Sequence, residues 1–272
     1  MLQYKMLATD LDDSLLDNSF KISPADRGAI ARAVRAGVKV VLATGRMYRS
    51  ALPYCRELGL DTPLITYQGA LVKFPRAKEV LYSRPVPLNT ALELLERLMP
   101  KGYHINIYID DQLLVEKITE ESKIYQSISG IEPIPVGNLI TYLREQRRDP
   151  AKILVVSSEE NIDRLGEETK NLFGDRLYIT ESKPIFLECM HPEATKGRAL
   201  EAVAGYYGID PGDIIAVGDG CNDLDMIGYA GLGVAVANAG KELKSQADFI
   251  TGSNTCGGVA RVIGKFIFNE ED

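Results

Sequence analysis

The sequence contains no tryptophan, only two histidines and four widely spaced cysteines: Cys55, Cys189, Cys221 and Cys256. Because no two cysteines are close enough to form a C-x-x-C pair, we expect neither a cysteine zinc site nor a dithiol redox motif. His104 and His191 are too few to build a histidine-rich zinc centre. The spacing is typical of free thiols in a reducing compartment.

Long apolar runs are also missing. The longest, residues 38–43 and 153–156, have the length of buried strands and fall far short of the roughly 20 residues of a membrane-spanning helix. The N-terminal segment reaches acidic residues by Asp10 without the apolar stretch of a signal peptide. We therefore expect no membrane partner and a cytoplasmic location.

Basic residues are outnumbered by acidic ones. The 272 residues include 31 Lys and Arg and 38 Asp and Glu, which gives a formal net charge of −7. An acidic chain repels polyphosphate, so we expect no nucleic acid partner, although a small phosphate ester fits a local cationic pocket. Hydrophobic residues at 45% and charged residues at 25% are ordinary for a globular chain of one or two domains.

Short β-branched runs alternate with helical patterns over the first part of the chain. Strands are predicted at residues 5–9, 38–44 and 63–67, and helices at residues 25–36 and 50–58. Ser23 and Pro24 are typical of a helix start, and Gly37 and Gly59 of helix ends. This β-α-β-α-β order predicts a parallel sheet with helices on both faces.

After about residue 83 the alternation is interrupted. Two strand patterns, residues 103–109 and 112–117, flank Asp110-Asp111 and predict a β-hairpin. Further helices are predicted at residues 89–99, 120–129, 139–146 and 162–173, and strands at residues 152–157, 177–180 and 185–189. The alternation then resumes with helices at residues 197–207, 222–230 and 257–268 and strands at residues 214–218 and 233–237.

The predicted fold class is therefore α/β. A doubly wound, Rossmann-like domain with a parallel sheet is expected to consist of residues 1–83 and 190–272. An inserted α+β domain, residues 84–189, is expected to divide it.

The first polar cluster, Asp10 to Ser14, follows the first predicted strand. Ligands of open α/β sheets bind at the carboxyl ends of strands. Asp10 and Asp12 lie two residues apart and are expected to converge, so that they could share a divalent cation or divide nucleophilic and acid–base roles. Asp13 is expected to point elsewhere. A solvated acidic turn is the alternative interpretation.

Two further segments offer groups that bind phosphate. Thr44, Gly45 and Arg46 follow the second strand and supply a hydroxyl, a backbone N–H and a guanidinium. A simple strand–glycine–helix junction also explains Gly45. Lys196 lies at a predicted helix start, where the helix dipole disfavours a cation, which suggests a nearby anion. An exposed lysine is the plainer alternative.

The fourth cluster is G-D-G-C-N-D, residues 218–223, at a strand-to-helix turn. Asp219 leaves the strand as a candidate metal ligand, and Asn222 and Asp223 open the next helix. A helix cap alone needs only one such side chain, so the crowding favours a functional site. No P-loop, dinucleotide fingerprint or nucleophile elbow occurs in the chain.

Taken in this order, the four clusters resemble the haloacid dehalogenase-like (HAD) hydrolase superfamily. Its pattern is D-x-D-x-T/S, then Ser or Thr after the second strand, then Lys, then G-D-x-x-N-D. The T-G-R segment at residues 44–46, the Y-Q-G-A segment at residues 67–70 and the position of the insert are similar to the Cof-type phosphatases with a C2-type cap. The resemblance covers nearly the whole chain.

The resemblance implies a role for each matched residue. Asp10 would be the nucleophile that forms an aspartyl phosphate, and Asp12 the general acid and base. Mg²⁺ would lie between Asp10, the main-chain carbonyl of Asp12 and Asp219. The phosphoryl group would be held by residues of three loops: Thr44, Gly45, Arg46, Lys196 and Asn222. Lys196 would also offset the charge of the carboxylates.

Supporting roles and departures follow from the same resemblance. Ser14 and Asp223 would support the metal-binding loops without binding the metal themselves. Asp13 stands where the family usually has glycine, Ser14 where it usually has threonine, and Gln68 where it often has asparagine. The extra carboxylate of Asp13 would alter the affinity for the metal.

The expected function is that of a Mg²⁺-dependent phosphatase acting on a small phosphorylated metabolite, either a sugar phosphate or a phosphorylated cofactor. A phosphoryl group that is attacked by a carboxylate needs its negative charge neutralised, and one divalent cation and one lysine supply the positive charge. A phosphomutase using the same phosphoaspartate and a non-catalytic phosphate sensor are the alternatives. The partner is expected to be the small substrate alone, with the chain a monomer or a weak homodimer.

Overall fold

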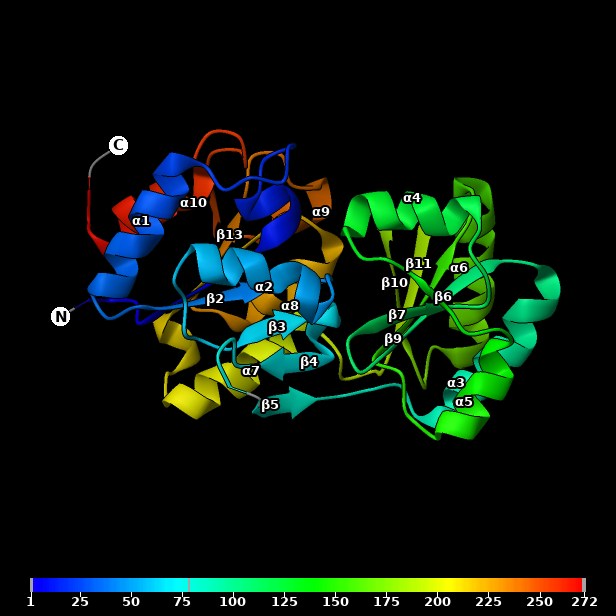
Figure 1. Cartoon of the computed structure of the whole chain (residues 1–272). Coiled ribbons are helices and arrows are strands. Elements are labelled where there is room, and N and C mark those ends of the chain that lie inside the picture. The colour runs from blue at the N-terminus through cyan, green and yellow to red at the C-terminus, as the bar shows by residue number, and fades with distance from the viewer. Residues whose placement is uncertain (1, 78, 271–272) are drawn as a thin grey trace. The chain divides into compact units, whose positions relative to one another are not determined.

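The computed structural model describes residues 2–77 and 79–270, which form two compact units (Figure 1). The first unit comprises the chain up to Gly45, Ala51–Tyr82 and the chain from Thr195 onward. The second comprises Arg46–Ser50 and Ser83–Ala194. Within the described residues, every helix is too short or too polar to span a bilayer.

The first unit is built on one sheet with the strand order β14-β13-β12-β1-β2-β3-β4-β5. Its strands are β1 (Met6–Asp10), β2 (Lys39–Ala43), β3 (Leu64–Thr66), β4 (Leu71–Lys73), β5 (Val80–Ser83), β12 (Ile214–Gly218), β13 (Leu232–Ala235) and β14 (Phe249–Ile250). From β14 to β3 neighbouring strands are parallel. The predicted α/β fold with a doubly wound sheet is confirmed.

Helices cover this sheet on both sides (Figure 1). They are α1 (Pro24–Arg35), α2 (Tyr48–Glu57), α7 (Lys196–Tyr207), α8 (Leu224–Tyr229), α9 (Lys241–Gln246) and α10 (Gly258–Val262). Apolar residues of α7 and α8 form one core cluster with alternate residues of the central strands, while α1 contacts β2 and packs against α10. Ser23 caps α1 as predicted, because its hydroxyl accepts a hydrogen bond from the N–H of Asp26.

The sequence patterns missed or misplaced some elements of this unit. The edge of the sheet is not parallel: β3 pairs with β4 in the antiparallel direction. Strands β4, β5 and β14 and helix α9 were not predicted, because they have six residues or fewer and show no clear period. The final helix, predicted over residues 257–268, is an α-helix only over Gly258–Val262 and continues as a π-type turn at Ile263–Ile267.

The second unit has its own sheet with the strand order β10-β11-β9-β6-β7-β8. The strands are β6 (His104–Ile109), β7 (Gln112–Val115), β8 (Ile134–Pro135), β9 (Lys152–Val156), β10 (Tyr178–Lys183) and β11 (Phe186–Met190). Strands β6 and β7 form the predicted hairpin, with Asp110 and Asp111 both at positive φ, 50° and 60°. Two positive φ values in a two-residue loop match the twist of a hairpin.

The helices of the second unit are α3 (Leu88–Leu98), α4 (Glu120–Ser129), α5 (Leu139–Gln146) and α6 (Glu159–Phe173). Leucine and isoleucine residues of α3, α5 and α6 pack on one face of the sheet. The other face carries buried polar side chains. There the Lys152 ammonium lies 2.8 Å from Glu188 Oε1, and Tyr125 of α4 packs against Tyr108 and Phe186.

Candidate active site

Three loops of the first unit meet at the carboxyl edge of its sheet. Strand β1 lies between β12 and β2, with Asp10 opposite Ala43 and Thr9 opposite Val217. Because all three strands are parallel, the residues that follow them emerge at the same edge. Asp10, Thr44 and Asp219, far apart in the sequence, are therefore brought to one place, as predicted.

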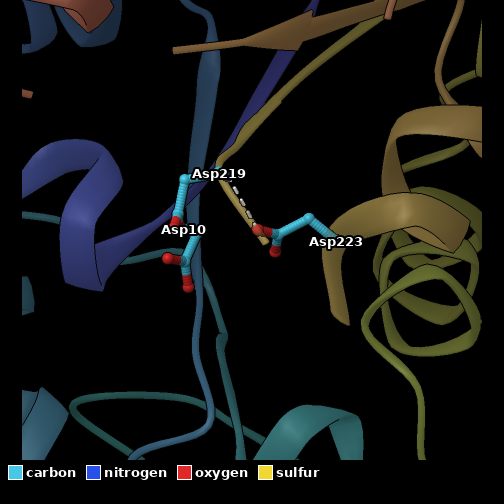
Figure 2. A group of neighbouring side chains, drawn as sticks. All are labelled: Asp10, Asp219 and Asp223. Atoms are coloured by element: carbon cyan, nitrogen blue, oxygen red, sulfur yellow. Dashed lines mark hydrogen bonds between the residues drawn. The ribbon is translucent and has the colours of Figure 1, made fainter. Parts of the chain in front are cut away.

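Asp10, Asp219 and Asp223 form a compact carboxylate cluster (Figure 2). Each offers an oxygen within 4.8 Å of the others. Asp10 and Asp223 are buried and Asp219 is partly buried. Figure 2 shows Asp10 and Asp219 at the ends of their strands, with Asp223 reaching back from the start of the next helix.

Lys196 is buried within this cluster. Its Nζ atom lies 2.6 Å from Asp10 Oδ1 and 2.6 Å from Asp223 Oδ1, and the ammonium is fully buried. The lysine is the first residue of α7, whose N-cap is Thr195. The unfavourable placement of a cation at a helix start is offset by two direct ion pairs, and the alternative of an exposed lysine is wrong.

Asp223 holds both the lysine and the loop that precedes it. Its Oδ2 atom accepts hydrogen bonds from the N–H groups of Asp219, at 3.0 Å, and Gly220, at 3.1 Å. A Cβ atom on Gly218 would lie 2.5 Å from the Asp223 side chain, so glycine is required at that position. With both oxygens already engaged, Asp223 is suited to a supporting role.

Charge in the cluster is unbalanced, because the only described cation paired with it is Lys196. Burial raises the pKa of Asp10 well above its usual value; Lys196 opposes this, and the other carboxylates, including Asp12, add to it. Burial and then Asp223 raise the pKa of Asp219 to about 6, although the Ser14 hydroxyl donates to Asp219 Oδ1 at 3.0 Å. Burial alone would lower the pKa of Lys196, but Asp10 and Asp223 raise it, so the lysine stays charged.

The donor atoms fit a hard divalent cation. Asp10 and Asp219 supply carboxylate oxygens without a competing thiol or imidazole in the group. Oxygen ligands of this kind select Mg²⁺ or Ca²⁺ over zinc or copper. A cation bound there would also balance the excess negative charge around Lys196.

The loop after Asp10 is a tight π-type turn at Leu11–Leu15. Asp12 is half-buried and is not a member of the three-carboxylate group, although its charge acts on Asp10. Asp13 is exposed, as expected, and has φ of 57°. This left-handed backbone explains why glycine suits the position, and Asp is among the few other residues that tolerate it.

The loop after β2 contains Thr44, which is buried and whose N–H donates to the Ile65 carbonyl at 3.0 Å. A Cβ atom on Gly45 would lie 2.5 Å from Gln68 Nε2, so a larger residue there would force the Gln68 side chain to move. Arg46 belongs to the second unit, where its charge acts on Tyr125. Of the three phosphate-binding residues predicted in this loop, the structure groups Thr44 and Gly45 in the first unit with the carboxylate loops.

Sequence reasoning missed three residues that shape these loops. Gln68, noted only as a departure from the family, accepts a hydrogen bond from Asn222 Nδ2 at 2.9 Å. Asn238 Nδ2 donates to the Asp13 carbonyl at 2.7 Å, and Asp225 Oδ2 accepts from the Gly197 N–H at 2.9 Å. For Asp225, the only signal in the sequence was its position two residues after the G-D-x-x-N-D motif.

Comparisons with known proteins identify the family of the chain and similar structures. A family model described as haloacid dehalogenase-like hydrolase matches residues 7–263. The 5-amino-6-(5-phospho-D-ribitylamino)uracil phosphatase YwtE of Bacillus subtilis is 32% identical, over 97% of this chain and 98% of its own. The pyridoxal phosphate phosphatase YbhA of Escherichia coli is 28% identical, over 95% of this chain and 97% of its own. A crystal structure from Thermotoga maritima has a TM-score of 0.85 at 31% identity, covering 96% and 97% of the chains.

Proposed function

The chain belongs to the haloacid dehalogenase-like hydrolases and acts on phosphate esters; on this premise we propose that it is a Mg²⁺-dependent phosphatase of small phosphorylated metabolites, working through an aspartyl phosphate. The observation that carries the proposal is the buried Lys196 ammonium, 2.6 Å from Asp10, at the edge where Asp219 and Asp223 converge. A phosphoryl group in transfer carries spread negative charge and needs this kind of fixed, positive surrounding.

The side chains that would hold Mg²⁺ are Asp10 and Asp219, together with the main-chain carbonyl of Asp12. When bound, the cation neutralises charge on the phosphoryl oxygens. Asp223 is already committed to Lys196 and two backbone N–H groups, so its part is to hold these ligands in place. Ser14 does the same for Asp219 through its hydroxyl.

The reaction proceeds in two displacements. An Asp10 carboxylate oxygen attacks phosphorus, the bond from phosphorus to the ester oxygen breaks, and the Asp12 carboxyl donates its proton to the leaving alkoxide. Asp12, now ionised, accepts a proton from water as that water attacks the aspartyl phosphate. Inorganic phosphate leaves and Asp10 is regenerated. Thr44, the N–H groups near Gly45 and Asn222 position the phosphoryl oxygens beside Lys196.

The substrate class follows from the division of the chain into two units. All the proposed core residues serve the phosphoryl group, which every phosphate ester shares, so the leaving group must be recognised elsewhere. We assign that recognition to the second unit, acting as the cap. The two relatives named above are phosphatases of pyridoxal phosphate and of 5-amino-6-(5-phospho-D-ribitylamino)uracil, which supports a small phosphorylated substrate of that size.

One experiment tests the mechanism. Asp12→Ala, supplied with p-nitrophenyl phosphate and Mg²⁺, is expected to accumulate a phosphoryl group on Asp10, because this leaving group needs little acid assistance while hydrolysis lacks its base. Mass spectrometry of the acid-quenched protein measures the added group, and Asp10→Asn should show none. Asp163→Asn, which alters an exposed carboxylate on α6, is the matched control and should turn over normally. An unmodified Asp12→Ala protein with normal turnover contradicts both roles.

A further inference from the structure

Gln68 connects the loops on either side of the nucleophile. It lies in a short 3-10 turn at Tyr67–Gly69, directly after β3, and the residue is only 2% exposed. Its backbone N–H donates to the Thr44 carbonyl at 3.1 Å. Gln68 is thereby attached to the loop after β2, one of the two loops that face the phosphoryl group.

The Gln68 side chain reaches the other loop. Its Oε1 atom accepts a hydrogen bond from Asn222 Nδ2 at 2.9 Å. In the sheet, β12 and β2 lie on opposite sides of β1, the strand that ends in Asp10. One buried residue therefore bridges the two loops across the end of the strand that carries the nucleophile: its backbone N–H bonds the loop after β2 and its side chain bonds the loop after β12.

The Gln68 amide is packed closely on one side by the backbone of Gly45. A Cβ atom on Gly45 would lie 2.5 Å from Gln68 Nε2, so the amide lies against the α-carbon of Gly45. Gln68 also has φ of 57°, a left-handed conformation that costs a non-glycine residue free energy and persists only where the surroundings hold it.

The orientation of Asn222 is set from both ends of its amide. Its Nδ2 atom faces Gln68, and its Oδ1 atom lies against Gly220, where a Cβ atom would be only 2.5 Å away. A primary amide nitrogen has two N–H donors. Gln68 accepts from one, which leaves the other to donate toward an oxygen of a bound phosphoryl group.

We propose that Gln68 is a positioning residue: it fixes the Asn222 amide so that the amide donates to the phosphoryl oxygens, and it does not itself contact the substrate. This inference rests on the proposed function, in which Asn222 binds phosphate. Asparagine, the residue often found at this position in the family, is one methylene shorter and would not hold Asn222 at the same place from this backbone.

The test is a double-mutant cycle of Gln68→Met and Asn222→Ala. Methionine keeps the length of glutamine but cannot make the hydrogen bond. For each variant, kcat and KM are measured with p-nitrophenyl phosphate, and the Kd of inorganic phosphate is measured by calorimetry with Mg²⁺. Gln246→Met, the same substitution at an exposed position in α9, is the matched control.

Gln68→Met is expected to raise KM and the Kd of phosphate together by about fivefold to tenfold, while kcat stays within about twofold of the wild type. The reason is that the Asn222 amide binds the ground state and the transition state alike, so a misplaced amide weakens both equally. In the Asn222→Ala background the same substitution should change either value by less than about twofold. Gln246→Met should match the wild type.

Two results would overturn the proposal. One is an equal effect of Gln68→Met with and without Asn222, which would mean that Gln68 acts independently. The other is unchanged KM and Kd in the single variant. Gln68→Asn provides the same comparison if Gln68→Met does not fold, as judged by thermal unfolding. If the wild type neither binds phosphate nor hydrolyses the ester, the proposed function fails and this inference with it.

Discussion

Gly69 lies directly against the main-chain carbonyl of Thr195: a Cβ atom on Gly69 would be 2.1 Å from that oxygen. Thr195 is the N-cap of α7, and the next residue is the buried Lys196. The turn after β3 therefore determines where α7 begins, and with it the position of the ammonium group beside Asp10.

The first prediction follows from this contact. Gly69→Ala should lower the free energy of unfolding by more than about 2 kcal/mol, because it adds a clash with backbone to the strain of a residue at φ of 102°. It should also raise the Kd of inorganic phosphate, since Lys196 would be displaced. Urea unfolding and calorimetry measure the two effects.

Gly37→Ala separates the clash from the strain. Gly37 has φ of 93° but no atom within 4 Å of a built Cβ, so alanine there suffers the backbone strain alone. It should cost about 1 kcal/mol and leave phosphate binding unchanged. Equal losses of stability in the two variants would show that the Gly69–Thr195 contact has no effect of its own.

The second prediction compares two buried lysines. Lys196→Met leaves Asp10 and Asp223 buried without their cation, which should destabilise the first unit by about 3–5 kcal/mol and abolish hydrolysis of every substrate. Lys152→Met similarly leaves the buried Glu188 carboxylate of the second unit without its cation, although the Ser182 hydroxyl still donates to it, and should cost about as much stability. Hydrolysis of p-nitrophenyl phosphate by Lys152→Met should nevertheless stay within about tenfold of the wild type.

Thermal unfolding and steady-state kinetics, both at a temperature where the variants remain folded, provide the measurements. The contrast distinguishes a catalytic lysine from a structural one of equal burial. If Lys152→Met loses p-nitrophenyl phosphate hydrolysis as completely as Lys196→Met, essential groups lie in the second unit and the proposed assignment of the site to the first unit is wrong.

Much of the fold was predictable because its information is local. Hydrophobic runs of strand length, helix starts such as Ser23 and glycines such as Gly37 act within a few residues of the chain. Once three strands are parallel and adjacent, the residues after them must share one edge, so the meeting of Asp10 with Asp219 was also predictable. The hairpin at Asp110-Asp111 follows from turn chemistry in the same way.

The rest depends on contacts between residues far apart in the sequence. Gln68 and Asn222 are separated by 154 positions, and nothing near either residue indicates the bond between them. Glycine is needed at position 69 because a Cβ atom there would clash with the main-chain carbonyl of Thr195, which lies far away in the sequence at the start of α7. Strand β4 has only three residues, fewer than a period-two pattern needs to be recognised.

The third prediction concerns pH and His104 of the second unit. Burial lowers the pKa of His104 from 6.5, although Asn106 and Glu121 oppose the shift. Its ring nitrogens lie 2.9 Å from Asn106 Oδ1 and 2.9 Å from Thr119 Oγ1, the N-cap of α4. Because the pKa of His104 is lower in the folded state than in the unfolded state, the unfolded state takes up a proton more readily. The histidine therefore stabilises the folded state fully above pH 6.5, its unfolded pKa, and this contribution is lost as the pH falls from 6.5 through the folded pKa.

The free energy of unfolding of the wild type should therefore fall more between about pH 7 and pH 5 than that of His104→Gln, which cannot take up the proton. The difference between the two curves, obtained from urea unfolding, removes the contribution of the carboxylates, which both proteins share, and leaves that of the histidine. Parallel curves, or a wild type that gains stability relative to the variant on acidification, would contradict the shift.

The last prediction concerns the metal and uses stability as the readout. Without Mg²⁺ the carboxylate cluster repels itself, so Asp219→Asn, which removes one charge, should unfold at a higher temperature than the metal-free wild type. Adding Mg²⁺ should reverse the order. The wild type should gain about 2.7 kcal/mol at a hundredfold excess over Kd, while Asp219→Asn should gain little because a ligand is lost.

EDTA should remove both the Mg²⁺-dependent stabilisation and the activity of the wild type, and Mg²⁺ should restore them. Ca²⁺ should stabilise the protein through the same oxygens but inhibit hydrolysis, because its larger and looser coordination shell displaces the Asp10 carboxylate from its line of attack. Asp163→Asn, with its change on the exposed face of α6, should respond to Mg²⁺ like the wild type. If Asp219→Asn gains as much stability from Mg²⁺ as the wild type does, or if the wild type is fully active in EDTA, Asp219 does not bind a catalytic cation.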